Sequence, residues 1–160
     1  MKAPRLNTLS IESNNEPGLA LLAQIHRAAF ALQDEHAWTE SSFRQLLVSP
    51  GFEAKIYELD GDPIGFSLVR RVLDEAELIS LAVLPALQGK GLAKKIMNLV
   101  IEQLKARACR GFFLEVREDN MKAIQLYYKI GFKKVGKRKG YYKTKSGKKV
   151  DAFVFSLNFN

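Results

Sequence analysis

The sequence predicts an α/β fold in which a mixed, mostly antiparallel central sheet is flanked by helices. Strand-like apolar runs and stretches of helical periodicity follow one another along the whole chain. Asp60-Gly61-Asp62-Pro63 separates two of the strand-like runs and is a strong hairpin signal. Further on, an apolar strand runs into a glycine-bearing turn that opens a strongly patterned helix, over residues 80–96.

The first half of the chain is expected to hold a strand, two helices and a three-stranded meander. Asn15-Glu16-Pro17 resembles a helix start, because proline is tolerated in the first turn, and Leu21, Leu22 and Ile25 recur at helical spacing. A second, short helix starts at Thr39 and is ended by Ser49-Pro50-Gly51. The expected strands cover residues 5–11, 54–59, 64–72 and 77–84.

The second half is expected to hold two longer helices and three strands. The first helix runs from about Gly91 to Ala108 and carries Ile96, Leu99 and Val100 on its apolar face. Asn120 caps the second, which stops at Gly131. The strands cover residues 112–116, 132–143 and 150–159.

Length and composition predict one globular domain over residues 1–160. The chain is 47% hydrophobic and 26% charged. Residues 1–15 lack the apolar centre of a signal peptide, and no run of ~18 apolar residues suggests a membrane span. We therefore expect a cytosolic protein with no membrane contact. Cys109 is the single cysteine and there are two histidines, so we expect neither a disulfide nor a metal site.

The net charge of +8 is concentrated in one segment. Residues 133–149 carry nine lysines and arginines and no acidic residue, and the rest of the chain is close to neutral. Such a segment is typical of contact with a polyanion, whether RNA, a ribosome surface or the phosphates of a cofactor. A solvated hairpin kept soluble by its lysines explains it equally well, and the sequence leaves both interpretations open.

The turn at residues 88–93 is a candidate phosphate site. Gly89 and Gly91 permit close approach of the backbone, and the helix that follows offers unpaired N–H groups and the positive end of its dipole. The turn fits neither the P-loop string nor the dinucleotide fingerprint, which would need a glycine where Lys94 stands. Taken alone, it could also be an ordinary glycine-rich connection.

The hexamer Gln88-Gly89-Lys90-Gly91-Leu92-Ala93 resembles the Gln/Arg-x-x-Gly-x-Gly/Ala signature with which the GNAT superfamily of N-acetyltransferases holds the pyrophosphate of acetyl-CoA. The order of expected elements is also that of the GNAT fold. Further segments, at residues 72–83, 113–117, 120 and 123–132, are most similar to the bacterial RimI type, which acetylates the N-terminal alanine of a small-subunit ribosomal protein. Three features depart from that pattern: Gly89 stands where arginine is common, Ala93 ends the hexamer in place of glycine, and the lysine-rich run after Tyr142 lacks an expected proline.

The resemblance implies roles for particular residues. Glu115 would be the general base and Tyr127 the proton donor to the departing thiolate. Residues implied in cofactor binding are Leu81, Ala82, Val83, Gln88, Gly89, Lys90, Gly91, Leu92, Ala93 and Asn120. From pattern alone, Glu115 could be a solvated strand residue, Tyr127 a core residue and Asn120 a plain N-cap. Cys109 is not expected to be a nucleophile, since no histidine stands near it in sequence.

The resemblance implies an acetyl-CoA-dependent N-acetyltransferase that transfers an acetyl group directly, in a ternary complex, to a protein N-terminal α-amine. Freeing a neutral amine at pH 7 costs about 1.4 kcal/mol for an α-amine and ~4.6 kcal/mol for lysine. One glutamate therefore suffices for an N-terminus, without excluding lysine. Acceptors such as lysine, a polyamine or another small amine remain alternatives, as does a non-catalytic module that binds RNA or the ribosome. The oligomeric state is open.

Overall fold

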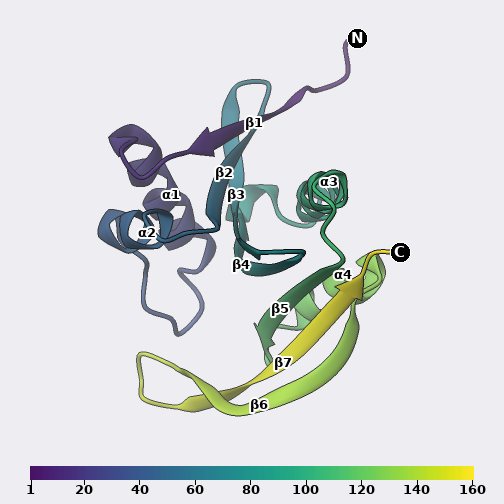
Figure 1. Ribbon diagram of the computed structural model, residues 1–160. Helices are drawn as coiled ribbons and strands as arrows, with labels where there is room; N and C mark the ends of the chain where they lie inside the picture. The colour runs from purple at the N-terminus through teal and green to yellow at the C-terminus, as the bar shows by residue number, and fades with distance from the viewer.

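The structure is a computed structural model that describes all 160 residues. Seven strands form one sheet in the order β1-β2-β3-β4-β5-β7-β6 (Figure 1). The predicted α/β class, with a mixed and mostly antiparallel sheet flanked by helices, is confirmed. The elements are β1 (Leu6–Ile11), α1 (Glu16–Ala29), α2 (Glu40–Leu47), β2 (Phe52–Leu59), β3 (Asp62–Val72), β4 (Glu75–Val83), the 3-10 turn η1 (Pro85–Leu87), α3 (Leu92–Ala106), β5 (Gly111–Arg117), α4 (Met121–Ile130), β6 (Lys133–Lys143) and β7 (Lys149–Asn158).

All neighbouring strands are antiparallel except β4 and β5, which α3 connects as a crossover. The predicted hairpin between β2 and β3 is present. Asp60 and Gly61 take φ values of 52° and 92° in its turn, which is the left-handed region that such tight turns require. Because β4 and β5 are parallel, their C-terminal ends lie at the same end of the sheet.

Helices α1 and α2 cover one face of the sheet over β2, β3 and β4. Their buried residues, such as Leu22 and Phe43, pack with Ile56, Phe66 and Ala82 from the strands. Both predicted helix starts are confirmed, since the Asn15 side chain accepts from the Gly18 N–H and Thr39 forms a capping box.

Helices α3 and α4 cover the opposite face. Ile96 and Met97 of α3 are fully buried and pack in one cluster with Phe112 of β5 and Phe155 of β7. Gly131 ends α4 with a φ of 114°, as predicted. Each face of the sheet therefore has its own hydrophobic core, formed with the pair of helices that covers it. None of the helices is both long enough and apolar enough to cross a membrane.

Strands β4 and β5 separate part-way along their length. Their pairing ends at Leu78 and Leu114, while β4 continues to Val83 against β3 and β5 continues to Arg117 against β7. The facing edges of the two strands are unpaired beyond this point. The sheet thus opens between its two halves, and this opening positions the site described below.

Some element bounds differ from those expected. β2 begins at Phe52 and β4 at Glu75, each two residues earlier than the sequence indicated, because pairing with β3 extends both strands. Gly51 supplies the turn that lets β2 begin at once, with a φ of 86°. The turn η1 was not predicted, since three residues show no helical periodicity.

Candidate functional site

Beyond Leu78, the edge of β4 that faces β5 has backbone groups that form no hydrogen bond with another strand. Leu84 donates its N–H to Ile64 of the β3 side. Because successive backbone groups of a strand alternate between its two edges, the N–H groups of Leu81 and Val83 face the opening, whereas that of Ala82 faces β3. Gln88 folds back to this edge, and its Nε2 donates to the Val83 carbonyl at 2.9 Å. The Gln88 side chain therefore fixes the following turn against the end of β4.

The predicted phosphate turn carries a run of unpaired amides. Gly89 and Gly91 have φ values of 77° and 78°, and a Cβ built on either would meet nothing within 4 Å. The backbone N–H groups from Gly89 to Lys94 donate no hydrogen bond within the protein, and α3 has no capping side chain. Consecutive unpaired amides at the positive end of a helix form a site suited to an anion. The geometry thus fits the pyrophosphate of a nucleotide-like cofactor without a metal.

The other residues of the phosphate turn and Asn120 lie around the same opening. Lys90 is exposed beside the unpaired amides, Leu92 is buried and anchors the start of α3 in the core, and Ala93 is partly buried. Asn120 caps α4, and its Oδ1 accepts from the Ala123 N–H at 3.3 Å. The N-cap interpretation of Asn120 is thereby confirmed, and its amide nitrogen forms no hydrogen bond within the protein.

Tyr127 projects from α4 into the core beneath the opening. Its ring packs edge-on against Phe132, with centroids 5.7 Å apart, and lies 6.2 Å from the ring of Phe155. Only 7% of the residue is exposed, and its hydroxyl makes no hydrogen bond within the protein. Burial raises the pKa of Tyr127 well above its ordinary value, so the hydroxyl stays protonated at neutral pH. The side chain is therefore both a core residue and an available proton donor.

Glu115 lies on the sheet face opposite α3 and α4, and its side chain is 18% exposed. Its Oε1 accepts from Nη1 of Arg138 at 2.6 Å. The backbone carbonyl of Glu115 accepts a long bond from the Tyr142 hydroxyl, at 3.4 Å. Burial, and after it the charge of Glu115, raises the pKa of Tyr142 strongly, and Tyr127 acts on it as well. Glu115 and Tyr127 thus belong to opposite faces of the sheet, and both are close enough to Tyr142 to affect its pKa.

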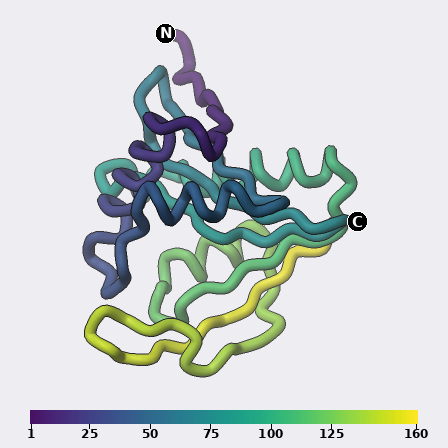
Figure 2. Tube along the Cα trace, turned by 60° about the vertical axis from the view of Figure 1, so that its left-hand side comes forward, coloured from purple at the N-terminus to yellow at the C-terminus, as the bar shows by residue number.

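Two loops that are distant in sequence contact each other. Asp34, in the loop between α1 and α2, accepts from the Ser146 hydroxyl, and its backbone carbonyl accepts from the Lys145 N–H at 3.3 Å. Figures 1 and 2 both show this loop beside the tip of the β6–β7 hairpin. Behind it, Glu35 lies 3.5 Å from the buried guanidinium of Arg117 at the end of β5. The two loops therefore form a connected rim.

Sequence reasoning missed Arg138, Glu77, Arg117 and Asp34. Glu77 is the first residue of an expected strand and resembles any half-exposed strand glutamate, although it lies near Glu115. Arg138 was one of nine cations in a basic segment, and nothing local distinguished it. Arg117 alone gave a signal: it is a charged residue directly after an apolar strand, and the structure buries it.

The remaining candidates have structural roles. Cys109 is buried in the core between α3 and β5. His26 is 2% exposed and stacks on Trp38, whose backbone N–H donates to the His26 Nδ1 at 3.3 Å. His36 is exposed in the loop before α2. No group of three His, Cys, Asp or Glu residues is arranged to hold a metal ion, and the expectation that none is required stays a prediction.

The fold, with its parted strands and its row of free amides, defines the class of protein. A sequence profile of the acetyltransferase (GNAT) family matches residues 19–132, and the chain belongs to that family.

Two bacterial relatives illustrate the similarity. The [ribosomal protein bS18]-alanine N-acetyltransferase of Salmonella typhimurium is 33% identical over 152 residues, which are 95% of this chain and 97% of the relative. The protein of the same name from Haemophilus ducreyi is 42% identical over 94 residues, which are 59% of this chain and 65% of the relative. The matched part of this chain thus covers less than two thirds of the length of the Haemophilus ducreyi protein.

Solved structures share the fold. The crystal structure of the ribosomal-protein-S18-alanine N-acetyltransferase from Escherichia coli superimposes with a TM-score of 0.80 at 28% identity, over 96% of this chain and 94% of that one. Arabidopsis thaliana NAA60 in complex with acetyl-CoA superimposes with a TM-score of 0.78 at 21% identity, over 98% and 99% of the two chains.

Proposed function

We propose that the chain is an acetyl-CoA-dependent N-acetyltransferase that modifies a protein N-terminal α-amine, and that its acceptor is the N-terminal alanine of a small-subunit ribosomal protein. The observation that carries the proposal is the opening between β4 and β5, which leaves free backbone amides along β4 and at the start of α3. Glu115 follows the last residue of β5 that pairs with β4, and Tyr127 projects from α4 into the core that packs against this half of the sheet. The printed names of the bacterial relatives support the acceptor.

The donor would be held mainly by backbone groups. The unpaired N–H groups from Gly89 to Lys94 would bind the pyrophosphate, and those of Leu81 and Val83 would bind the thioester oxygen and the pantetheine arm. Asn120 keeps its amide nitrogen free for a further contact. When bound, acetyl-CoA supplies the activated acetyl group.

Glu115 and Tyr127 would move the protons. Glu115 accepts the proton that the acceptor ammonium must lose, directly or through one water, and the freed amine attacks the thioester carbonyl. A C–N bond forms, the C–S bond breaks, and Tyr127 donates its hydroxyl proton to the departing sulfur. The second proton of the attacking nitrogen passes, directly or through water, to the Tyr127 oxygen, so that the amide and the CoA thiol are formed and Tyr127 is restored. The high pKa of Tyr127 ensures that this proton is present at neutral pH. Deprotonating an α-ammonium at pH 7 costs only about 1.4 kcal/mol, which suits a single carboxylate base.

The test of this function is a panel of acceptor peptides with purified protein. A peptide that begins with alanine and has the ribosomal sequence should release CoA and gain one acetyl group at its N-terminus, located by mass spectrometry. The same peptide with a blocked N-terminus and a free lysine is the control, together with a polyamine. Transfer to the control acceptors alone would replace the proposed acceptor by lysine or a small amine. The expected cytosolic location is part of the proposal.

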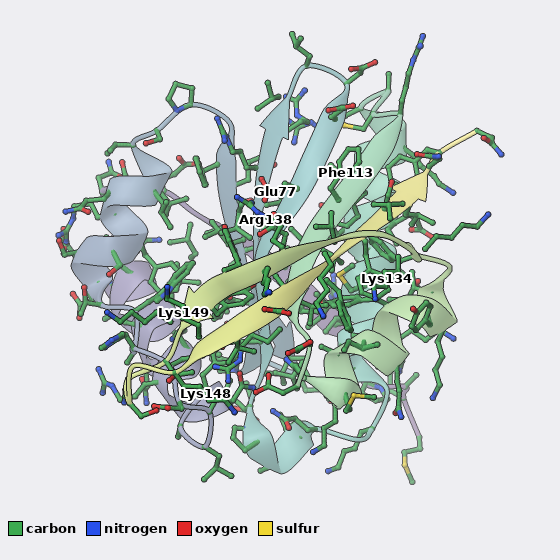
Figure 3. The ribbon with its side chains drawn as sticks, turned by 90° about the horizontal axis from the view of Figure 1, so that it is seen from below. Glu77, Phe113, Lys134, Arg138, Lys148 and Lys149 are labelled. Carbon is green, nitrogen blue, oxygen red and sulfur yellow. The ribbon has the colours of Figure 1, made fainter.

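A second candidate function is contact with RNA through the basic segment at residues 133–149. Of its nine cations, only Lys137 and Arg138 form ion pairs, and the other seven are exposed. β6 is the edge strand of the sheet, and Figure 3 shows Lys134, Lys148 and Lys149 spread along its ribbon with β7. Unpaired cations on a protruding edge support contact with a polyanion. We propose this contact as an addition to catalysis.

Salt dependence distinguishes RNA contact from a solvated hairpin. Binding of a small ribosomal RNA fragment should weaken steeply as salt rises, with a log–log slope of about −3 if some four phosphates are contacted. A variant with four lysines of the segment changed to glutamine should lose this binding, and a control with four exposed lysines elsewhere should keep it; the two sets are Lys139, Lys143, Lys148 and Lys149, and Lys2, Lys105, Lys122 and Lys129. Competition by acetyl-CoA would assign the segment to the cofactor instead. RNA binding without any acetyl transfer would favour the non-catalytic module.

A further inference from the structure

Arg138 lies between two carboxylates and is bonded to only one of them. Its guanidinium pairs with Glu115 at 2.6 Å, as described above. The side chain of Glu77 forms no ion pair and no hydrogen bond within the protein, although the charge of Arg138 acts on it. Figure 3, which looks at this face of the sheet, shows Glu77 and Arg138 next to each other. A second carboxylate is thus within the reach of one arginine.

The strand register explains why the two carboxylates share a face. Glu77 of β4 stands opposite Phe113 of β5, and Glu115 is two residues further along β5. Side chains two residues apart on a strand point to the same side, so Glu77, Phe113 and Glu115 line one face. Burial, and after it the charge of Glu115, raises the pKa of Glu77, whereas Arg70 and Arg138 lower it. These effects agree with the close spacing of the groups.

Arg138 is not enclosed by other side chains. It stands on the edge strand β6, its side chain is 53% exposed, and it reaches across β7 to Glu115. Its guanidinium lies over the Tyr141 ring, 4.1 Å from the centroid, and this contact can persist while the outer end changes partner. An ion pair with a partner so exposed contributes about 1 kcal/mol or less, so breaking it costs little.

The resting pair conflicts with the role proposed for Glu115. A carboxylate that holds a guanidinium at hydrogen-bond distance, as Glu115 does, has one oxygen occupied. An acceptor ammonium needs the same oxygen. Resting on the proposed function, we propose that Arg138 occupies the place of the acceptor ammonium in the free protein and moves to Glu77 when the acceptor enters. Glu77 is then a positioning residue that keeps Glu115 free during transfer.

The surroundings of Glu77 suit this second position. A surface cavity of about 190 Å³ adjoins it, lined in part by Arg70, Glu75 and Phe113. The other acidic residues near β6, Glu118 and Asp151, are already paired with Lys137. Glu77 is therefore an unpaired carboxylate next to Arg138, with a surface cavity beside it.

A double-mutant cycle tests the proposal. Glu77→Gln should lower kcat/KM for the acceptor about tenfold, because Arg138 would remain on Glu115, and should leave acetyl-CoA affinity unchanged. In an Arg138→Gln background the same substitution should have no further effect, since no arginine is left to move. Glu75→Gln, on the same strand and at the same cavity, is the matched control and should behave as the unmodified protein.

The outcomes separate this inference from the proposed function. Equal losses from Glu77→Gln in both backgrounds would show that Glu77 acts without Arg138, and no loss in either would show that it does not act; both overturn the inference while transfer itself persists. A crystal structure with the Ala-starting peptide and CoA bound gives a readout independent of turnover. Arg138 should lie on Glu77 there, and an Arg138–Glu115 pair retained beside the bound peptide would refute the movement.

Discussion

Asp34 and Ser146 are hydrogen bonded across the mouth of the candidate site, although 112 residues separate them in sequence. Asp34 belongs to the loop that follows α1, on the first helical layer, and Ser146 to the tip of the β6–β7 hairpin. This bond joins the helical layer over β2, β3 and β4 to the hairpin at the β6 edge of the sheet. We expect the joined loops to border the entrance through which an acceptor would pass.

Asp34→Ala should loosen this entrance. Removing the carboxylate breaks the bond between the two loops and leaves the Ser146 hydroxyl with Thr144 as its partner. The lost hydrogen bond, worth ~1 kcal/mol, should raise KM for the acceptor about fivefold. Acetyl-CoA affinity should not change, because the donor groups belong to β4 and α3. Asp62→Ala, at an exposed aspartate in the β2–β3 hairpin, is the control. Steady-state kinetics with each substrate varied in turn provide the measurement, and an equal change in both KM values would contradict the assignment of this loop to the acceptor.

Tyr127→Phe should reduce turnover and spare the rest of the protein. The ring that packs against Phe132 and Phe155 is retained, and the lost hydroxyl has no hydrogen bond within the protein, so the free energy of unfolding should change by less than ~1 kcal/mol. The rate constant kcat should fall about a hundredfold or more, the range of a lost proton donor. Tyr128→Phe, at the exposed neighbour, should be silent. A matched loss of turnover and acetyl-CoA affinity would instead assign Tyr127 to binding.

Gly91→Ala should weaken cofactor binding more than it weakens the fold. The left-handed φ of 78° makes a side chain cost about 1 kcal/mol of stability, and the new methyl group would point into the free space over the unpaired amides. We expect acetyl-CoA to bind at least about tenfold more weakly, which is a change of ~1.4 kcal/mol. Gly61→Ala carries comparable strain at a φ of 92° in another turn and should leave binding unchanged. Isothermal titration calorimetry and urea denaturation measure the two effects.

His26 should make the fold less stable in mild acid. Burial lowers its pKa to about 4 in the folded protein, from 6.5 when exposed. The unfolded chain therefore binds more protons between these values, so stability is complete above pH 6.5 and is lost as pH falls towards 4. At pH 5 the loss relative to pH 7.5 should be about 2 kcal/mol.

The substitution His26→Gln isolates this contribution. It should flatten the change in the free energy of unfolding between pH 7.5 and pH 5, even though the altered contact with Trp38 lowers stability at both. His36→Gln, at an exposed histidine, is the matched control and should keep the original pH dependence. Urea denaturation at the two pH values measures both, and an unchanged slope in His26→Gln would assign the acid sensitivity to other groups.

Most elements of the fold could be predicted because their signals are local. Asn15 and Asn120 cap their helices, Gly131 ends α4, and the Asp60–Pro63 turn joins two strands, all within a few residues of the expected places. Strand ends were less accurate, since Phe52 and Glu75 join their strands only through pairing with β3. The separation of β4 from β5 had no sequence signal, because it depends on which edges find partners.

The candidate site was predictable where the backbone or a motif carries it. Gly89 and Gly91 take the expected left-handed conformations, and their surroundings are open as an anion site requires. The partner of Glu115 could not be predicted, because Arg138 is 23 residues away and reaches it across β7. The roles of Glu115, Tyr127 and Asn120 stay predictions until the variants above are measured.

The unpaired amides along β4 and at the start of α3 have a practical consequence for experiments. Amides are present whatever side chain a residue carries, so alanine scanning of residues 81–83 or 92–94 will under-report the contribution of these positions to donor binding. Replacing single peptide bonds by esters, through semisynthesis or hydroxy-acid incorporation, removes the N–H itself and leaves the side chain in place. Residues on the other side of the opening act through side chains. Sequence variation among family members should therefore alter the choice of acceptor more readily than the choice of donor.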